Sequence, residues 1–235
     1  MLERLVAFDT VSHKPNLELI EFVRDYLAAH DVKSLILPGV VAGKANLYAR
    51  IGPSDGSAIG LSGHTDVVPV EGQTWSSDPF QLKERDGKLY GRGTCDMKGY
   101  LAVCLALLPE MRAAGLKTPI DLFLTHDEEV DCSGALQMGQ DIGRHLPVPH
   151  AVIIGEPTMM RVVDAHKSAR EFFTEVTGFE AHSSMTHTGA SAISAGAMIV
   201  AEIDRLRDDL IARGDPSGRF TPRSALGSNP SWTAL

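Results

Sequence analysis

The sequence has little that suits a membrane-bound, secreted or nucleic-acid-binding protein. No apolar run approaches the roughly 18 residues that a membrane-spanning helix needs. Residues 1–6 lack the charged, apolar and small-residue order of a signal peptide. Lys and Arg number 22 against 30 Asp and Glu, the net charge is −8, and no basic patch stands out. We therefore expect neither a membrane nor a nucleic acid as a partner.

Cysteine is scarce as well. Three cysteines, Cys95, Cys104 and Cys132, cannot form a complete set of disulfides, which fits a reducing cytoplasm. Each is interpreted as a small, buried apolar residue. What the sequence does contain is 43% hydrophobic residues over 235 positions, enough for a real core in one or two domains.

Short and long apolar patterns alternate along the first two thirds of the chain. Brief apolar runs bounded by Gly, Pro or charged residues predict strands at residues 34–37, 46–51, 58–62, 119–125 and 151–154. Apolar residues at helical spacing predict helices at residues 2–6, 16–29, 97–112 and 133–144, the last with Ser133 as its cap. This alternation favours an α/β fold with helices on both faces of a sheet.

The character of the sequence changes after residue 160. Residues 161–164 and 171–178 are predicted as strands of an antiparallel sheet, and residues 188–213 as a long helix. Residues 214–235, rich in Gly, Pro, Ser and Asn, are predicted as a loop. We therefore divide the chain into a first domain, residues 1–160, and a smaller α+β unit, residues 161–235.

Acidic and imidazole residues gather just after the predicted strands, where open α/β sheets place their sites. In chain order they are His64, Asp66, Asp96, Glu128, Glu129 and Glu156. Oxygen and nitrogen donors without thiolates suit zinc, cobalt or manganese in a catalytic site. In such a site Asp66 would hold the second ring nitrogen of His64, Glu129 would be a ligand, and Glu128 would be the general base.

Each of these signals has a simpler interpretation when taken alone. The His64-x-Asp66 pair could be structural, and Asp96 could cap the helix predicted from Met97. The acids at 127–129 could face water in a solvated turn. A phosphate-binding loop is not favoured, because neither a GxGxxG spacing nor a Walker-type GK[ST] is present. The combination of four such places favours the metal site.

The motifs that carry these residues resemble a known family. GHTDVVP (63–69), GRGTCDMKG (91–99), DEEV (127–130) and GEPT (155–158) are typical of the M20 family of two-metal peptidases and deacylases. The resemblance covers nearly all of residues 1–222, and residues 4–12, 75–80 and 160–167 are most similar to its acetylornithine deacetylase branch. It implies a zinc-peptidase-like, three-layer catalytic domain with a smaller α+β lid and dimerisation domain.

The resemblance also implies a cofactor and its ligands. Two divalent metal ions, zinc or cobalt, would be bound. His64 and Glu156 would bind one ion and Glu129 the other, while Asp96 would bridge the two.

The remaining roles follow from the same resemblance. Asp66 would orient His64, and Glu128 would pass a proton from the attacking water to the leaving amine. His182, in the lid, would reach the substrate carbonyl of a neighbouring subunit, which implies a homodimer; alternatively, it is an exposed polar residue before a Ser-Ser turn. The substrate would be an N-acyl amino acid, with N-acetyl-L-ornithine as the best candidate and arginine biosynthesis as the setting.

The sequence departs from the family pattern in three respects. Asp131 and Ser168 stand where relatives usually carry Gly. The family also supplies a second histidine for the Glu129 ion from a later return segment, and no counterpart of that segment is found after residue 222. We therefore expect the C-terminal part of both domains to be missing. This leaves open a partner-dependent or inactive metal-binding fragment, or a related aminoacylase or desuccinylase.

Overall fold

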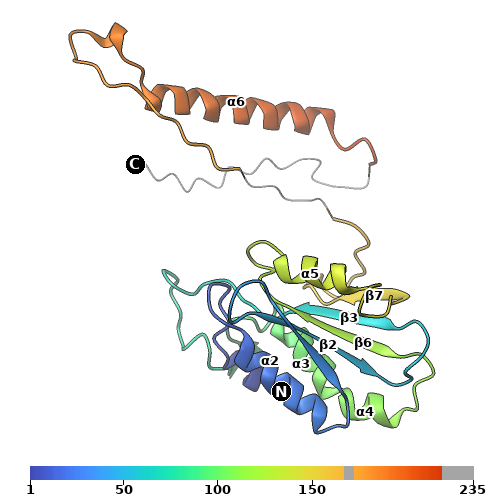
Figure 1. Cartoon of the computed structure of the whole chain (residues 1–235). Coiled ribbons are helices and arrows are strands. Elements are labelled where there is room, and N and C mark those ends of the chain that lie inside the picture. The colour runs from blue at the N-terminus through green and yellow to red at the C-terminus, as the bar shows by residue number, and fades with distance from the viewer. Residues whose placement is uncertain (167–171, 219–235) are drawn as a thin grey trace. The chain divides into compact units, whose positions relative to one another are not determined.

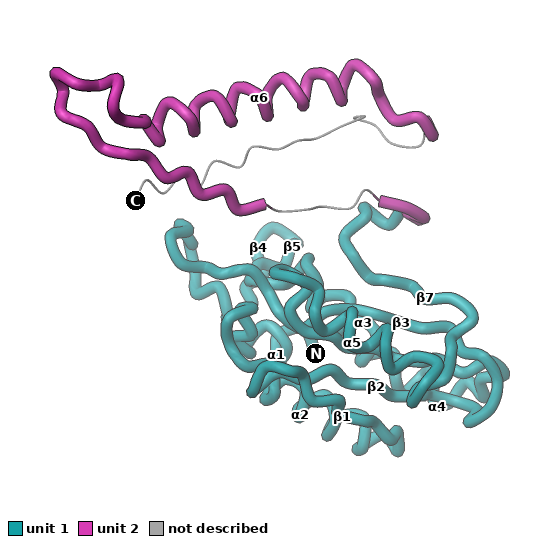
Figure 2. Tube along the Cα trace, turned by 45° about the horizontal axis from the view of Figure 1, so that its top comes forward, with its two compact units in different colours: residues 1–161 teal, residues 162–235 magenta. Residues whose placement is uncertain are grey.

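The computed structural model describes residues 1–166 and 172–218. The chain divides into two compact units, residues 1–161 and residues 162–235 (Figure 2). Every residue proposed to bind metal belongs to the first unit, whereas His182 belongs to the second.

The first unit is built on a five-stranded sheet of strand order β1-β2-β6-β3-β7 (Figure 1). The strands are β1 (Ser34–Pro38), β2 (Ala45–Ile51), β3 (Ile59–His64), β6 (Ile120–Thr125) and β7 (Ala151–Ile154). β3 pairs in parallel with both β6 and β7, whereas β2 is antiparallel to β1 and β6. The carboxyl ends of β3, β6 and β7 therefore meet at one edge of the sheet.

Helices cover both faces of this sheet, as the sequence predicts (Figure 1). One face carries α1 (Leu2–Val6), α2 (Leu17–Ala28), α3 (Lys98–Ala106) and α4 (Leu108–Ala113), and the other carries α5 (Ser133–Asp141). Because successive side chains of a strand point to opposite faces, Leu122 and Leu124 of β6 pack in the larger core and Phe123 packs beneath α5. None of the described helices is long and apolar enough to cross a membrane.

Two predicted helices need correction. The helix predicted over 97–112 is two helices that divide at Leu107, because Pro109 has no N–H to continue the hydrogen-bond ladder. The helix predicted over 133–144 ends at Asp141, and Gly143 follows with φ +83°. Ser133 is not its cap: Cys132 holds that position, and Asp131 Oδ1 accepts a 2.9 Å hydrogen bond from the Ser133 N–H.

A short hairpin, β4 (Lys83–Arg85) and β5 (Lys88–Tyr90), was not predicted. Every residue of both strands is exposed, so they lack the buried alternation by which strands are recognised in a sequence. The cysteines also differ from expectation. Cys104 is buried as predicted, but Cys95 and Cys132 are exposed.

The second unit contains one long helix, α6 (Ala192–Arg213), after a 3-10 turn, η1 (Thr186–Thr188). Ser191 caps α6 by accepting a 3.1 Å hydrogen bond from the Ser194 N–H. The strands predicted at 161–164 and 171–178 are not formed over the residues described there, and an isolated bridge joins Phe179 and Ala190. Residue 171, Ser168 and the predicted loop from 219 to 235 lie outside the described residues.

Candidate metal centre

His64 lies at the centre of the site. It is the last residue of β3, and its side chain is 1% exposed. Its Nε2 atom is 3.0 Å from Asp96 Oδ1, 3.7 Å from Glu156 Oε1 and 3.9 Å from Glu128 Oε2. Residues that are distant in the sequence are thus gathered around one imidazole nitrogen.

The donor atoms fall into two overlapping groups. His64, Glu128 and Glu156 form one, and His64, Asp96 and Glu129 form the other, with the donors of each group within 4.8 Å of one another. The two groups have His64 in common, and together they place the carboxylates of four acidic residues around its imidazole. Glu128 lies within ligand distance too, so geometry alone does not separate a ligand role from a base role.

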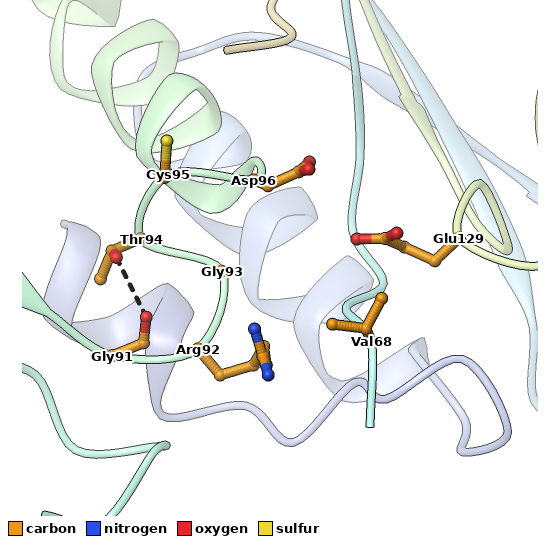
Figure 3. Close-up of a pocket in the computed structure, with 8 residues that line it drawn as sticks. All are labelled: Val68, Gly91, Arg92, Gly93, Thr94, Cys95, Asp96 and Glu129. Atoms are coloured by element: carbon orange, nitrogen blue, oxygen red, sulfur yellow. Dashed lines mark hydrogen bonds between the residues drawn. The ribbon is translucent and has the colours of Figure 1, made fainter. Parts of the chain in front are cut away.

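An open cleft reaches two of these carboxylates, those of Asp96 and Glu129. Its volume is about 330 Å³, and its lining includes Arg92, Asp96 and Glu129. Figure 3 shows the carboxylates of Asp96 and Glu129 directed toward each other from opposite sides of the cleft. The volume is at the lower end of the range for small-molecule sites.

Asp66 is fully buried beneath the site. Its carboxylate accepts hydrogen bonds from the Ser12 hydroxyl at 2.7 Å and from the main-chain N–H groups of Glu128 and Glu129 at 3.1 and 3.2 Å. Nδ1 of His64 lies 2.9 Å from the main-chain oxygen of Asp66 and 3.5 Å from its Oδ1. Asp66 therefore contacts both the imidazole and the turn that carries the two glutamates.

The loop 91–99 carries Asp96 to His64, and its main chain packs tightly against neighbouring atoms at two glycines. Gly93 has φ +80°, and a Cβ there would lie 2.7 Å from Val67 Cγ1. A Cβ on Gly99 would lie 2.3 Å from the main-chain oxygen of Thr94. The helix α3 begins at Lys98 with Met97 as its N-cap and no side-chain cap, so the interpretation of Asp96 as a helix cap is wrong.

The electrostatics of the site call for positive charge. Burial, together with the charge of Asp96, raises the pKa of Glu129 to about 7 and raises that of Glu156 in the same direction. Burial alone would lower the pKa of His64, but its hydrogen bond with Asp66 and the nearby charges outweigh burial and raise the pKa to about 9. A carboxylate cluster that is costly to ionise and that has one imidazole at its centre fits divalent cations.

Two buried lysines near the site were not predicted from the sequence. Lys44 lies in the connection between β1 and β2 and donates to Asp127 Oδ1 at 2.6 Å. Lys98 is fully buried and donates to the main-chain oxygen of Phe8 at 2.6 Å, and burial lowers its pKa to about 7. Lys98 lies within the GRGTCDMKG motif, but the contacts of both lysines have no local signal, because their partners are 83 and 90 residues away.

His182 lies in the second unit on an exposed segment. Its Nδ1 atom is 2.8 Å from Ser184 Oγ and accepts from the Ser184 N–H at 3.2 Å. Its predicted contact with a substrate carbonyl stays a prediction.

Comparison with known proteins identifies the family. The pattern of "Peptidase family M20/M25/M40" matches residues 60–216, a stretch that includes all seven residues singled out from the sequence. The chain belongs to this family. Its mixed α/β sheet with helices on both faces is the catalytic-domain fold that the M20 resemblance implied.

Individual proteins that are similar to this chain are a deacetylase and two peptidases. The chain is 37% identical over 209 residues to the acetylornithine deacetylase of Shigella sonnei. This alignment covers 88% of this chain and 53% of the relative. A Staphylococcus aureus tripeptidase is similar in fold, with a TM-score of 0.61 at 18% identity over 85% of this chain and 54% of the other. Human carnosine dipeptidase 1 is also similar in fold, with a TM-score of 0.57 at 23% identity. The match covers 65% of this chain and 37% of the dipeptidase. The chain spans about half the length of the curated relative it matches.

Proposed function

We propose that this M20 chain carries most of a two-metal centre for hydrolysis of the amide bond of N-acyl amino acids. The observation that carries the proposal is the convergence of His64, Asp96, Glu129 and Glu156 at one edge of the sheet, with donor atoms close enough to share cations. Membership of the family supports the metal-dependent chemistry.

Each ligand has a proposed place. His64 and Glu156 would hold one ion and Glu129 the other, and Asp96, whose side chain is 48% exposed, would contact both. Two divalent cations, zinc or cobalt, would supply Lewis-acid stabilisation of the developing negative charge and make water a nucleophile near neutral pH. The raised pKa values of Glu129 and Glu156 support this placement, because cations would relieve the repulsion between the carboxylates.

The chain's own residues handle the proton and the geometry. Glu128 takes a proton from the attacking water and delivers it to the leaving amine. Asp66 orients His64 and holds the turn at residues 128–129 through its hydrogen bonds. His182, presented by the second unit, binds the substrate carbonyl in a neighbouring subunit, so the active assembly is a homodimer.

The best substrate candidate is N-acetyl-L-ornithine, which would place the protein in arginine biosynthesis. The supporting observation is the 37% identity to an acetylornithine deacetylase, together with a cleft whose 330 Å³ suits a small acyl amino acid. A related aminoacylase or desuccinylase activity is the alternative. A cytoplasmic location is part of the same proposal and rests on the three free cysteines.

The test measures free amine released from N-acetyl-L-ornithine by the purified chain, first stripped of metal and then supplied with Zn²⁺ or Co²⁺. Metal-dependent turnover that is lost in Glu128→Ala supports the proposal. Equal turnover of N-acyl amino acids other than the ornithine derivative would move the substrate to the aminoacylase class.

A second candidate is a metal-binding chain that needs a partner segment for catalysis. The observation that favours it is the donor set of Glu129: among residues 1–166 and 172–218, the imidazole grouped with this carboxylate is His64, and no second one joins them. The two candidates are separated by measuring turnover of the chain alone and of the chain mixed with the part of a full-length deacetylase that this chain does not align with. Turnover only in the mixture supports the second.

A further inference from the structure

A closed ring of polar contacts lies beneath the turn that carries Glu128 and Glu129. The Lys44 ammonium donates to Asp127 Oδ1 and to the Ser12 main-chain oxygen, both at 2.6 Å. The Ser12 hydroxyl donates to Asp66, and Asp66 accepts from the N–H groups of Glu128 and Glu129. The peptide bond between Asp127 and Glu128 closes the ring.

The turn itself depends on being held. Asp127 adopts φ +57°, a left-handed conformation that is uncommon for residues other than glycine and in which aspartate is one of the more frequent exceptions. Its main-chain oxygen accepts from the N–H groups of Asp131 and Cys132 at 3.2 and 2.8 Å, so the turn reverses on this one residue. Whatever fixes Asp127 therefore sets the direction in which Glu128 and Glu129 leave the sheet.

Lys44 and Asp127 are both buried charges. Their side chains are 5% and 10% exposed, and Asp127 Oδ2 also lies 3.0 Å from Nδ1 of the buried His126. A buried ion pair is a weak source of stability, because desolvation offsets the attraction, but its directional contacts fix geometry. Neither residue is among the proposed ligands, and Lys44 comes from a different connection of the sheet.

We propose that Lys44 is a positioning residue for the metal centre. By joining Asp127 to the main chain at Ser12, it holds the turn opposite Asp66, so that the two glutamates are fixed relative to His64 from both sides. The inference rests on the proposed metal function of Glu129 and on the general rule that partners behind metal ligands control affinity.

The test compares three variants with the wild-type chain. Lys44→Met removes the ammonium and keeps the apolar stem. The double variant Lys44→Met/Asp127→Asn also removes the carboxylate that the first change leaves buried without its cation. Lys117→Met is the matched control, since Lys117 is an exposed lysine. The readouts are the thermal midpoint, Co²⁺ and Zn²⁺ affinity by competition with a chelating dye, and hydrogen exchange at the Glu128 and Glu129 amides.

Lys44→Met is expected to weaken Co²⁺ and Zn²⁺ binding by about 10–100-fold. It is also expected to speed exchange of the Glu128 and Glu129 amides at least about tenfold, while core amides of β6 keep their protection. The double variant is expected to recover the thermal midpoint but not the affinity. Lys117→Met is expected to behave as wild type.

Two results would overturn the inference: amides at 128 and 129 that stay protected in Lys44→Met, or an affinity that recovers in step with thermal stability in the double variant. The second result would make Lys44 a stability element alone. A wild-type chain that binds neither ion would instead overturn the proposed function, and the amide exchange would still decide whether Lys44 holds the turn.

Discussion

Replacing Asp66 with asparagine removes a fully buried charge while keeping nearly the same shape. The carboxylate accepts from Ser12, Glu128 and Glu129, and it faces the His64 imidazole. An amide has one acceptor oxygen and one donor nitrogen, so at least one of these three donors would then face another donor. The variant should therefore lose stability and loosen the turn at residues 128–129.

The size of the loss follows from the pKa of Asp66. Burial alone would raise this pKa, but the hydrogen bonds from His64 and Ser12 and the nearby charge outweigh burial and lower it from 3.8 to about 2. A difference of about 1.8 pKa units at 1.36 kcal/mol each gives about 2.5 kcal/mol in favour of the charged form. Because asparagine resembles protonated aspartate, Asp66→Asn should lower the free energy of unfolding by about that amount.

The sign of the pH dependence follows from the same shift. The folded pKa lies below the unfolded value, so the stabilisation by Asp66 is fully present above pH 4 and is lost as pH falls toward 2. Urea unfolding of the metal-free chain should be followed at pH 5.5, where His64 is protonated in both states, and at pH 2.5. The difference between wild type and Asp66→Asn should shrink to a small remainder at the lower pH.

The exposed Asp55 provides the control. Asp55→Asn should change the free energy of unfolding by less than about 0.5 kcal/mol at either pH. An Asp66→Asn protein that is as stable as wild type at pH 5.5 would refute the reasoning, and so would a deficit that persists undiminished at pH 2.5.

Three further predictions concern the site and the sheet. Glu128→Gln should reduce amine release by about 10²–10⁴-fold and leave Co²⁺ affinity within a few fold; a parallel loss of affinity would make Glu128 a ligand. Since burial and Asp96 raise the pKa of Glu129 to about 7, Zn²⁺ affinity should fall as pH drops through 7. Calorimetry in two buffers should detect the released protons, and their absence would contradict the shift. Asp121 is fully buried and pairs with Arg50 at 2.7 Å, so Arg50→Met would leave its carboxylate buried without a cation. This change should lower the free energy of unfolding in urea by about 3–5 kcal/mol. The exposed Arg85→Met serves as its control, and a loss of the same size there would argue against a buried-pair effect.

Much of the first unit was predictable from local patterns. The strands at 46–51 and 119–125 were found to within two residues, because they are largely buried and form apolar runs with clear breaks. The strand at 151–154 is exposed, but its four residues are all apolar and were found as well. The hairpin of β4 and β5 was missed because its six residues are all exposed. The division of the helix at Leu107 could have been read from Pro109.

The second unit was less predictable. Its long helix was found, since the Ala-rich segment has strong helical propensity and a serine cap. The strands predicted before it are not formed over the described residues, because an apolar run becomes a strand only where a partner supplies the second half of its hydrogen bonds.

Sequence motifs alone singled out the residues that we propose as metal ligands, because His64, Asp96, Glu129 and Glu156 each stand in a motif whose residue types suit metal binding. Their convergence was also predictable in outline, since parallel strands place their carboxyl ends at one edge. Only the tertiary structure decided how the turn at residues 128–129 is held. Lys44 and Asp127 are 83 residues apart, and Ser12 and Asp66 are 54 apart. Contacts over such separations depend on how the sheet orders its strands, and no local pattern records that order.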